Sequence, residues 1–246
     1  MKALIFAAGL GTRLRPVTNS IPKALVPVGG IPMLQRVLMK IKDAGISEIV
    51  VNAHHFSDQI VGFIKDNDGF GADVRVSVEK DEPLETGGGI RHAEPLLKGC
   101  GRFLVHNADI LSDLSLEWLF TADRPDSLAT LVVQEAEADR YLLFNDDMRL
   151  VGWTNVRTGE IKSPYPGLDI SSCHRYSFCG IHIISEDVFP LMKQWPDRFG
   201  IIDFYLSVAH RIPIVGVIPA SLKLIDIGSP EKLAEAEASV WEIAKK

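Results

Sequence analysis

Short apolar runs alternate with amphipathic segments along the N-terminal part of the chain. Residues 3–8 are apolar throughout, which is typical of a strand buried on both faces of a sheet. A second strand is expected at 48–52, and a third, with alternating polarity, at 73–78. The segments 31–44 and 56–65 repeat apolar side chains at helical spacing. This order of strands and helices predicts a parallel sheet with crossover helices.

Strands and helices continue to alternate through the rest of the chain. Further strands are expected at 103–106, 128–134, 178–184 and 214–218, and further helices at 90–97, 114–120, 186–193, 202–210 and 230–246. The segments 141–145 and 150–155 flank Asp146-Asp147 as a hairpin, and residues 157–175 are expected to be irregular. No linker or repeat interrupts this pattern, so we expect one α/β domain over residues 1–246.

The first strand is followed by a glycine-rich loop with the character of a phosphate-binding site. Gly9 and Gly11 lack a Cβ atom, which allows the backbone to turn sharply and to present N–H groups to an anion. Arg13 adds a fork of hydrogen-bond donors, and Lys23 adds a second cation within a proline-stiffened segment. The chain contains no Gly-x-x-x-x-Gly-Lys-Ser/Thr string, and Leu14 stands where a dinucleotide-binding fingerprint has its third small residue.

The complete segment resembles the N-terminal signature of the sugar-phosphate nucleotidyltransferases, AAGxGxRxxPxTxxxPKxLxPV. The matching residues are Ala7-Ala8-Gly9, Gly11, Arg13-Leu14, Pro16, Thr18, Pro22-Lys23, Leu25 and Pro27-Val28. The resemblance implies a Rossmann-like three-layer αβα (GT-A-like) fold with a mixed, mainly parallel sheet. It also implies transfer of a nucleoside monophosphate from a nucleoside triphosphate to a sugar 1-phosphate, with release of pyrophosphate. The nucleotide-binding residues that it implies are Ala7, Ala8, Gly9, Leu10, Gly11, Thr12, Arg13, Glu82, Thr86, Gly87 and Gly88.

The triple glycine at 87–89 lies in the region that meets the nucleobase in this family. The string LETGGGI is most similar to the uridylyl-transferring members that act on N-acetylmuramic acid 1-phosphate. The hydrogen-bonding groups of these residues do not determine by themselves which nucleobase is bound. Backbone groups at 86–88 could pair with uracil, whereas the carboxylate of Glu82 or Glu85 could accept from guanine.

Two aspartates are candidate magnesium ligands. Asp109 follows the strand at 103–106, and carboxyl ends of parallel strands are where open α/β sheets place their ligands. As a lone aspartate it would more simply cap a turn, but the family holds Mg²⁺ with an aspartate at this place. Asp226 lies in a string that resembles the family's Trp-x-Asp-x-Gly-Thr-Pro, although Lys223 and Leu224 stand near the usual aromatic position and Ser229 replaces threonine.

The resemblance assigns roles to four residues in catalysis and four in sugar binding. Arg13, Lys23, Asp109 and Asp226 would be catalytic, with Mg²⁺ held by the two aspartates. Lys23, Asn107, Asn155 and Gly180 would face the sugar phosphate, the last within a Phe-x-Gly-Ile string under the sugar. The hairpin and loop at about 140–180 would then form the sugar side of the site.

Composition limits the classes of partner. A net charge of −6 argues against a nucleic-acid backbone, and no apolar run reaches the ~20 residues of a membrane span. Three irregularly spaced cysteines form no disulfide or zinc pattern, and the apolar start runs directly into the glycine loop rather than forming a signal peptide. We therefore expect a cytoplasmic enzyme, as a monomer or small homo-oligomer.

Three alternative functions remain open at this point. One is a guanylyltransferase that acts on heptose or mannose 1-phosphate. The second is a metal-dependent glycosyltransferase, which usually carries Asp-x-Asp where this chain has Asn107-Ala108-Asp109. The third is a non-catalytic nucleotide-binding regulator, which the presence of all four candidate catalytic residues disfavours.

Overall fold

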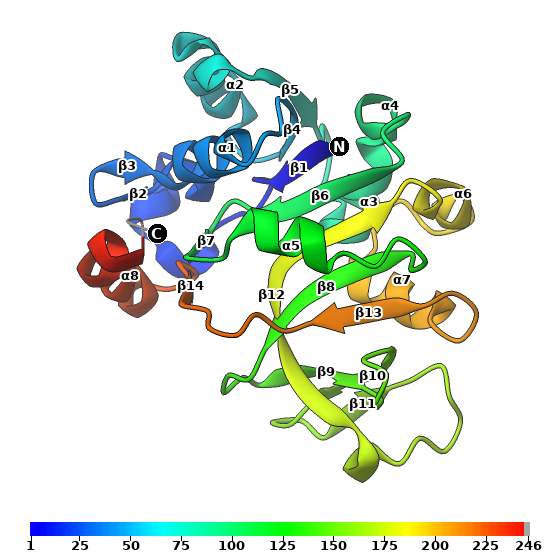
Figure 1. Ribbon diagram of the computed structural model, residues 1–246. Coiled ribbons are helices and arrows are strands. Elements are labelled where there is room, and N and C mark those ends of the chain that lie inside the picture. The colour runs from blue at the N-terminus through cyan, green and yellow to red at the C-terminus, as the bar shows by residue number, and fades with distance from the viewer. Residues whose placement is uncertain (244–246) are drawn as a thin grey trace.

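A mixed sheet with helices on both faces forms the centre of the molecule (Figure 1). The structure, a computed structural model, describes the backbone of residues 1–243 and the side chains of residues 1–240. Four strands run parallel in the order β5-β4-β1-β6, and they comprise β1 (Lys2–Phe6), β4 (Glu48–Ala53), β5 (Asp73–Val78) and β6 (Arg102–Asn107). The predicted Rossmann-like fold with a mixed sheet is confirmed.

The long strand β12 (His174–Ser185) connects the centre of the sheet to a lower group of strands (Figure 1). It runs antiparallel to β6 and β8 (Ala129–Gln134) at one end and to β9 (Arg140–Phe144) at the other. Strands β10 (Leu150–Asn155) and β11 (Glu160–Lys162) continue the lower sheet, and β13 (Ile214–Val217) pairs with β8. The predicted turn at Asp146-Asp147 is confirmed, whereas β11 lies in the segment expected to be irregular.

Two short ribbons, eight α-helices and five short 3-10 helices complete the described fold. The ribbons pair β2 (Pro27–Val28) with β3 (Ile31–Pro32) and β7 (Ile110–Ser112) with β14 (Leu224–Asp226). The α-helices are α1 (Met33–Asp43), α2 (Ser57–Asp66), α3 (Glu85–His92), α4 (Glu94–Leu97), α5 (Leu116–Ala122), α6 (Val188–Met192), α7 (Ile201–Val208) and α8 (Pro230–Ile243). The last three residues of the helix predicted at 230–246 lie outside the described residues. Among residues 1–243, no helix combines the length and apolar character that crossing a bilayer requires.

Successive residues of the central strands pack into different apolar clusters. In β6, Phe103 and Val105 join a cluster with Phe204 and Tyr205 of α7, whereas Leu104 joins one with Leu38 of α1. Because side chains alternate between the faces of a strand, both faces of this sheet are buried. The strand ends are therefore the part of the sheet at which a ligand can bind.

The buried His182 is expected to make stability depend on pH. It is 2% exposed in β12, and burial, assisted by the charge of His106, lowers the pKa of His182 to about 3. Since the folded pKa lies below the unfolded value of about 6.5, the unfolded chain takes up the proton first. The contribution of neutral, buried His182 to the free energy of unfolding is complete above about pH 6.5. It is lost as the pH falls, and the loss is about 2 kcal/mol at about pH 5.

Urea unfolding at pH 7 and pH 5 checks this expectation. The fall in unfolding free energy between the two values should be about 2 kcal/mol smaller in His182→Phe than in the unsubstituted chain. His210, an exposed histidine, provides the control, and His210→Phe should retain the full fall. Equal pH dependence in both variants would refute the assignment to His182.

Candidate active site

The two predicted metal ligands lie side by side although they are far apart in the sequence. Asp109 follows the carboxyl end of β6 and immediately precedes β7. Because β14 pairs antiparallel with β7, Asp226 lies opposite Ile110, and the Ile227 N–H donates to the Asp109 carbonyl at 3.0 Å. The small β7–β14 ribbon is thus the element that brings the two carboxylates together.

The ammonium group of Lys23 lies between these carboxylates. Its Nζ donates closely to Oδ2 of Asp109 and lies 3.4 Å from Oδ1 of Asp226. Burial raises the pKa of Asp226, and the neighbouring charge of Asp109 acts in the same direction, whereas Lys23 opposes both. The carboxylate pair is therefore an environment that favours a bound cation.

Arg13 lies beside Asp226, next to Gly228. Its Nη2 is 2.8 Å from the point where a Cβ on Gly228 would stand, and Oδ1 of Asp226 is 3.0 Å from the same point. The absence of a side chain at Gly228 thus permits the guanidinium and the carboxylate to approach the same stretch of backbone. The structure brings together all four of the predicted catalytic residues.

The glycine-rich loop from Ala8 to Arg13 leaves its backbone donors available. Among the described residues, no N–H group of this segment donates to another protein group, whereas the preceding Ala7 N–H donates to the Asn52 carbonyl at 2.8 Å. Gly11 has a φ of 63°, and its carbonyl accepts from the Thr18 hydroxyl at 2.7 Å, which fixes the turn. Ala7 and Ala8 lie beyond the end of β1, which ends two residues earlier than predicted. A row of free donors at a strand end suits a polyphosphate.

The donor set of this site fits Mg²⁺. Mg²⁺ in phosphoryl-transfer enzymes is held by one or two carboxylates and completes its six ligands with water and substrate phosphates. Asp109 and Asp226 supply two such carboxylates at a site that already attracts a cation. In the described part of the chain, no group of three His, Cys, Asp or Glu side chains forms a closed metal cage.

The triple glycine has a different environment from the one predicted. It lies inside α3 rather than in a loop before a helix at 90–97, and all three glycines are buried. A Cβ on Gly87 would collide with the ring of Phe199, and one on Gly88 with the Asp197 carbonyl. The N–H groups of Gly87 and Gly88 both donate to the Phe199 carbonyl, at 2.9 and 3.2 Å, and are not available to a base. Of the backbone groups at 86–88 that could pair with uracil, these two N–H groups are therefore excluded.

A cavity of about 550 Å³ lies beside the segment between β5 and α3. Glu82 and Gly88 line it, together with Arg91 and Arg198. Glu82 is exposed and its Oε2 lies 3.9 Å from Nη1 of Arg198, while the Thr86 hydroxyl accepts from the Ile201 N–H at 2.9 Å. Thr86 thus connects α3 to α7, and Glu82 remains accessible to a ligand.

Glu79 is a residue of this region that sequence reasoning missed. It is 3% exposed, and its carboxylate accepts from Nδ2 of Asn52 at 2.7 Å and from the Leu84 N–H at 2.8 Å. These bonds hold the segment between β5 and α3 against β4. The sequence offered one sign of this role, which is a polar residue directly after a predicted strand. Many turns at a protein surface have the same pattern, so the sign is not specific.

The predicted sugar-side residues divide between two places. Gly180, with a φ of 70°, lies against Asn107, whose Nδ2 is 2.6 Å from the point where a Cβ would stand. The space that a side chain at position 180 would need is therefore occupied by the side chain of Asn107. Asn155 lies further down β10, where it lines a cavity of about 480 Å³ and its Oδ1 accepts from the N–H groups of Arg157 and Thr158 at 3.0 and 3.3 Å.

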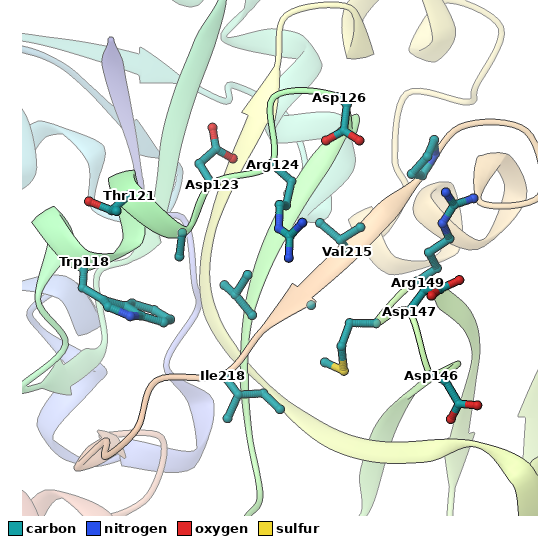
Figure 2. Close-up of a pocket in the computed structure, with 15 residues that line it drawn as sticks. Trp118, Thr121, Asp123, Arg124, Asp126, Asp146, Asp147, Arg149, Val215 and Ile218 are labelled. Atoms are coloured by element: carbon teal, nitrogen blue, oxygen red, sulfur yellow. The ribbon is translucent and has the colours of Figure 1, made fainter.

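A larger cavity of about 960 Å³ lies away from all of these residues, beside β13 (Figure 2). Figure 2 shows Trp118, Arg124, Val215 and Ile218 around it, with Asp146 and Asp147 on another part of its wall. It contains none of the predicted site residues. The carboxylate of Asp123 forms an ion pair with Arg102, and that of Asp146 pairs with His174. This cavity is not the candidate active site.

Comparison with known proteins places the chain among enzymes that activate sugars. The family model described as nucleotidyl transferase matches residues 2–143. The N-acetylmuramate alpha-1-phosphate uridylyltransferase of Caulobacter vibrioides is 30% identical over 247 residues, covering 98% of this chain and 97% of that protein. The mannose-1-phosphate guanyltransferase of Gibberella zeae is 35% identical over 140 residues, covering 56% of this chain and 38% of that protein.

Solved structures share the fold at lower identity. A crystal structure of HddC from Yersinia pseudotuberculosis complexed with GMP-PN has a TM-score of 0.74 and 24% identity, covering 97% of this chain and 99% of that one. UDP-glucose pyrophosphorylase complexed with UDP-glucose also has a TM-score of 0.74, at 18% identity and 98% coverage of both chains. These two likenesses support the fold.

Proposed function

The chain belongs to the nucleotidyl transferase family and is a nucleotidyltransferase that acts on a sugar 1-phosphate, and we propose that its substrates are UTP and N-acetylmuramic acid 1-phosphate. The similarity to the Caulobacter uridylyltransferase carries this proposal because it extends over nearly the whole of both proteins. It therefore includes the lower sheet and β12, the elements nearest to the predicted sugar side.

Transfer of guanylate to mannose 1-phosphate is the second candidate. The mannose-1-phosphate guanyltransferase of Gibberella zeae matches 56% of this chain, and a probable mannose-1-phosphate guanylyltransferase of Arabidopsis thaliana matches 95% of it, although only 68% of that protein is covered. The exposed Glu82 carboxylate supports this candidate, because it could accept the two donors on one edge of guanine. A glycosyltransferase or a non-catalytic regulator is disfavoured by the family match and by the convergence of Arg13, Lys23, Asp109 and Asp226.

We propose that the reaction is an in-line displacement at the α-phosphorus of the nucleotide. An oxygen of the sugar phosphate forms the new P–O bond, and the bond to the pyrophosphate leaving group breaks. The nucleophile is already an anion, so positioning and charge neutralisation provide most of the rate enhancement. No protein base is needed to remove a proton.

Different residues of the chain would act on the leaving pyrophosphate and on the reacting α-phosphate and sugar phosphate. The free N–H groups of Ala8 to Arg13 and the Arg13 guanidinium would bind the β- and γ-phosphates and stabilise the charge on pyrophosphate. Lys23 would neutralise charge between the α-phosphate and the sugar phosphate. Asp109 and Asp226 would hold Mg²⁺, which supplies Lewis-acid polarisation when bound.

Pyrophosphate release in the presence of Mg²⁺ tests the proposal. UTP, GTP, CTP, ATP and dTTP are each combined with the 1-phosphates of N-acetylmuramic acid, N-acetylglucosamine, mannose and glucose. Release that requires UTP together with the muramic acid derivative is expected. Release that requires GTP and mannose 1-phosphate would establish the second candidate instead.

A further inference from the structure

The cavity of about 480 Å³ on the lower sheet carries an organised row of polar side chains. Cross-strand pairing aligns Arg140 of β9 with Asn155 of β10, and Asn155 with Glu160 of β11. Residues directly opposite one another on neighbouring strands share a face, so these three side chains form one row. The next row on the same face is Leu142, Trp153 and Lys162. Ile202 and Asp203 at the start of α7 also line the cavity.

Most of the charged groups in this cavity have protein partners. The Lys162 ammonium lies 2.9 Å from Oδ1 of Asp203 and 3.8 Å from Oε1 of Glu160, and it also lies over the Trp153 ring at 5.2 Å. Arg140 is different. Within residues 1–240, its exposed guanidinium takes part in no hydrogen bond or ion pair with another side chain or carbonyl. It is a cavity-lining cation whose charge is left for a ligand.

Strand β12 and the start of α7 lead from this cavity toward residues of the candidate active site. Ser177 and Phe178 line the cavity, and Gly180, which contacts Asn107, follows on the same strand. At about 3.3 Å per residue, Phe178 lies roughly 7 Å along β12 from Gly180. On the opposite wall, Ile202 and Asp203 directly follow Ile201, whose N–H donates to Thr86 of α3. The elements that line this cavity are thus the same elements that contact the candidate active site through Gly180 and Thr86.

We propose that Arg140 binds a carboxylate on the sugar and selects an acidic sugar 1-phosphate over neutral ones. This inference rests on the proposed function, because N-acetylmuramic acid carries a lactyl carboxylate that mannose, glucose and N-acetylglucosamine lack. The sugar 1-phosphate itself is a second possible anion. Arg13 and Lys23 already provide cations beside the paired aspartates, and Arg140 lies in a separate cavity. A planar guanidinium matches a carboxylate with two parallel hydrogen bonds.

A substrate-by-variant comparison tests this proposal. The kcat/KM of uridylyl transfer is measured for N-acetylmuramic acid 1-phosphate and for the methyl ester of its lactyl group. The ester keeps the ring, the acetamide and the charged phosphate but lacks the negative charge of the carboxylate. The unsubstituted enzyme should prefer the free acid by about 10- to 10²-fold, the usual effect of a charge-assisted hydrogen bond. Arg140→Ala should lose this preference through a raised KM for the acid, with turnover of the ester unchanged. Arg140→Lys should recover part of the preference.

Arg157→Ala is the matched control. Arg157 is also an exposed arginine beside the lower sheet, but its guanidinium is paired with Asp139 at 3.4 Å, and its loss should leave the preference intact. An equal fall for acid and ester in Arg140→Ala would mean that Arg140 binds the shared phosphate or supports the fold, and would overturn the proposal. An unchanged preference would also overturn it. Absence of activity with both sugars in the unsubstituted enzyme would refute the proposed function and this inference with it.

Discussion

Alanine at Asp109 or Asp226 is expected to lower turnover by about 10²-fold or more, the usual scale for loss of a preorganised electrostatic group. Both carboxylates face the same cation-favouring point, at which the ammonium of Lys23 lies. Because they act on one bound cation, the double variant should lose much less than the product of the two single effects. Pyrophosphate release at saturating Mg²⁺ and nucleotide measures each variant.

The control for this prediction is Asp147→Ala. Asp147 is an exposed carboxylate in the turn between β9 and β10, outside the candidate site, and its loss should leave turnover within a factor of two or so. Circular dichroism and thermal unfolding establish that the variants fold. Near-normal turnover in a folded Asp109→Ala, Asp226→Ala enzyme would show that these residues do not hold the catalytic metal.

The local parts of the site could be read from the sequence, whereas the parts made by tertiary packing could not. The glycine loop and Lys23 are close in the chain, and their spacing is a property of one segment. Asp109 and Asp226 meet only because β7 pairs with β14. The family resemblance predicted both aspartates, but the hydrophobic pattern alone contains no information on that pairing.

The triple glycine shows why a local rule placed the start of this helix too late in the chain. Glycine is a poor helix former, so three in succession indicate a loop. In the structure, α3 includes them because the segment at 197–199 packs so closely that no Cβ could fit at Gly87 or Gly88. Tertiary contact thus outweighs helix propensity at this point. Glu79 and Arg140 were missed for a related reason, since only their neighbours across the sheet distinguish them from other surface charges.

Methionine at Lys23 is expected to have two opposite effects. Turnover should fall by about 10²-fold, because the charge that neutralises the reacting phosphates is lost. Divalent metal should bind more tightly to the nucleotide-free enzyme, by about tenfold or more, because the ammonium group no longer competes for the same two carboxylates. Titration with Mn²⁺, followed by electron paramagnetic resonance, measures the second effect independently of catalysis.

Lys40→Met distinguishes this competition from a general change in charge. The Lys40 ammonium is also partly buried, but it donates to the Ser112 carbonyl at 2.7 Å rather than to the aspartate pair. Its loss removes the same charge and should leave Mn²⁺ affinity nearly unchanged. If Lys23→Met instead binds Mn²⁺ more weakly than the unsubstituted enzyme, Lys23 organises the two carboxylates for the metal, and the competition between ammonium and metal does not occur. Tighter binding confined to Lys23→Met would mean that the metal displaces Lys23 from the aspartates, which leaves its charge available to the phosphates when the metal–nucleotide complex binds.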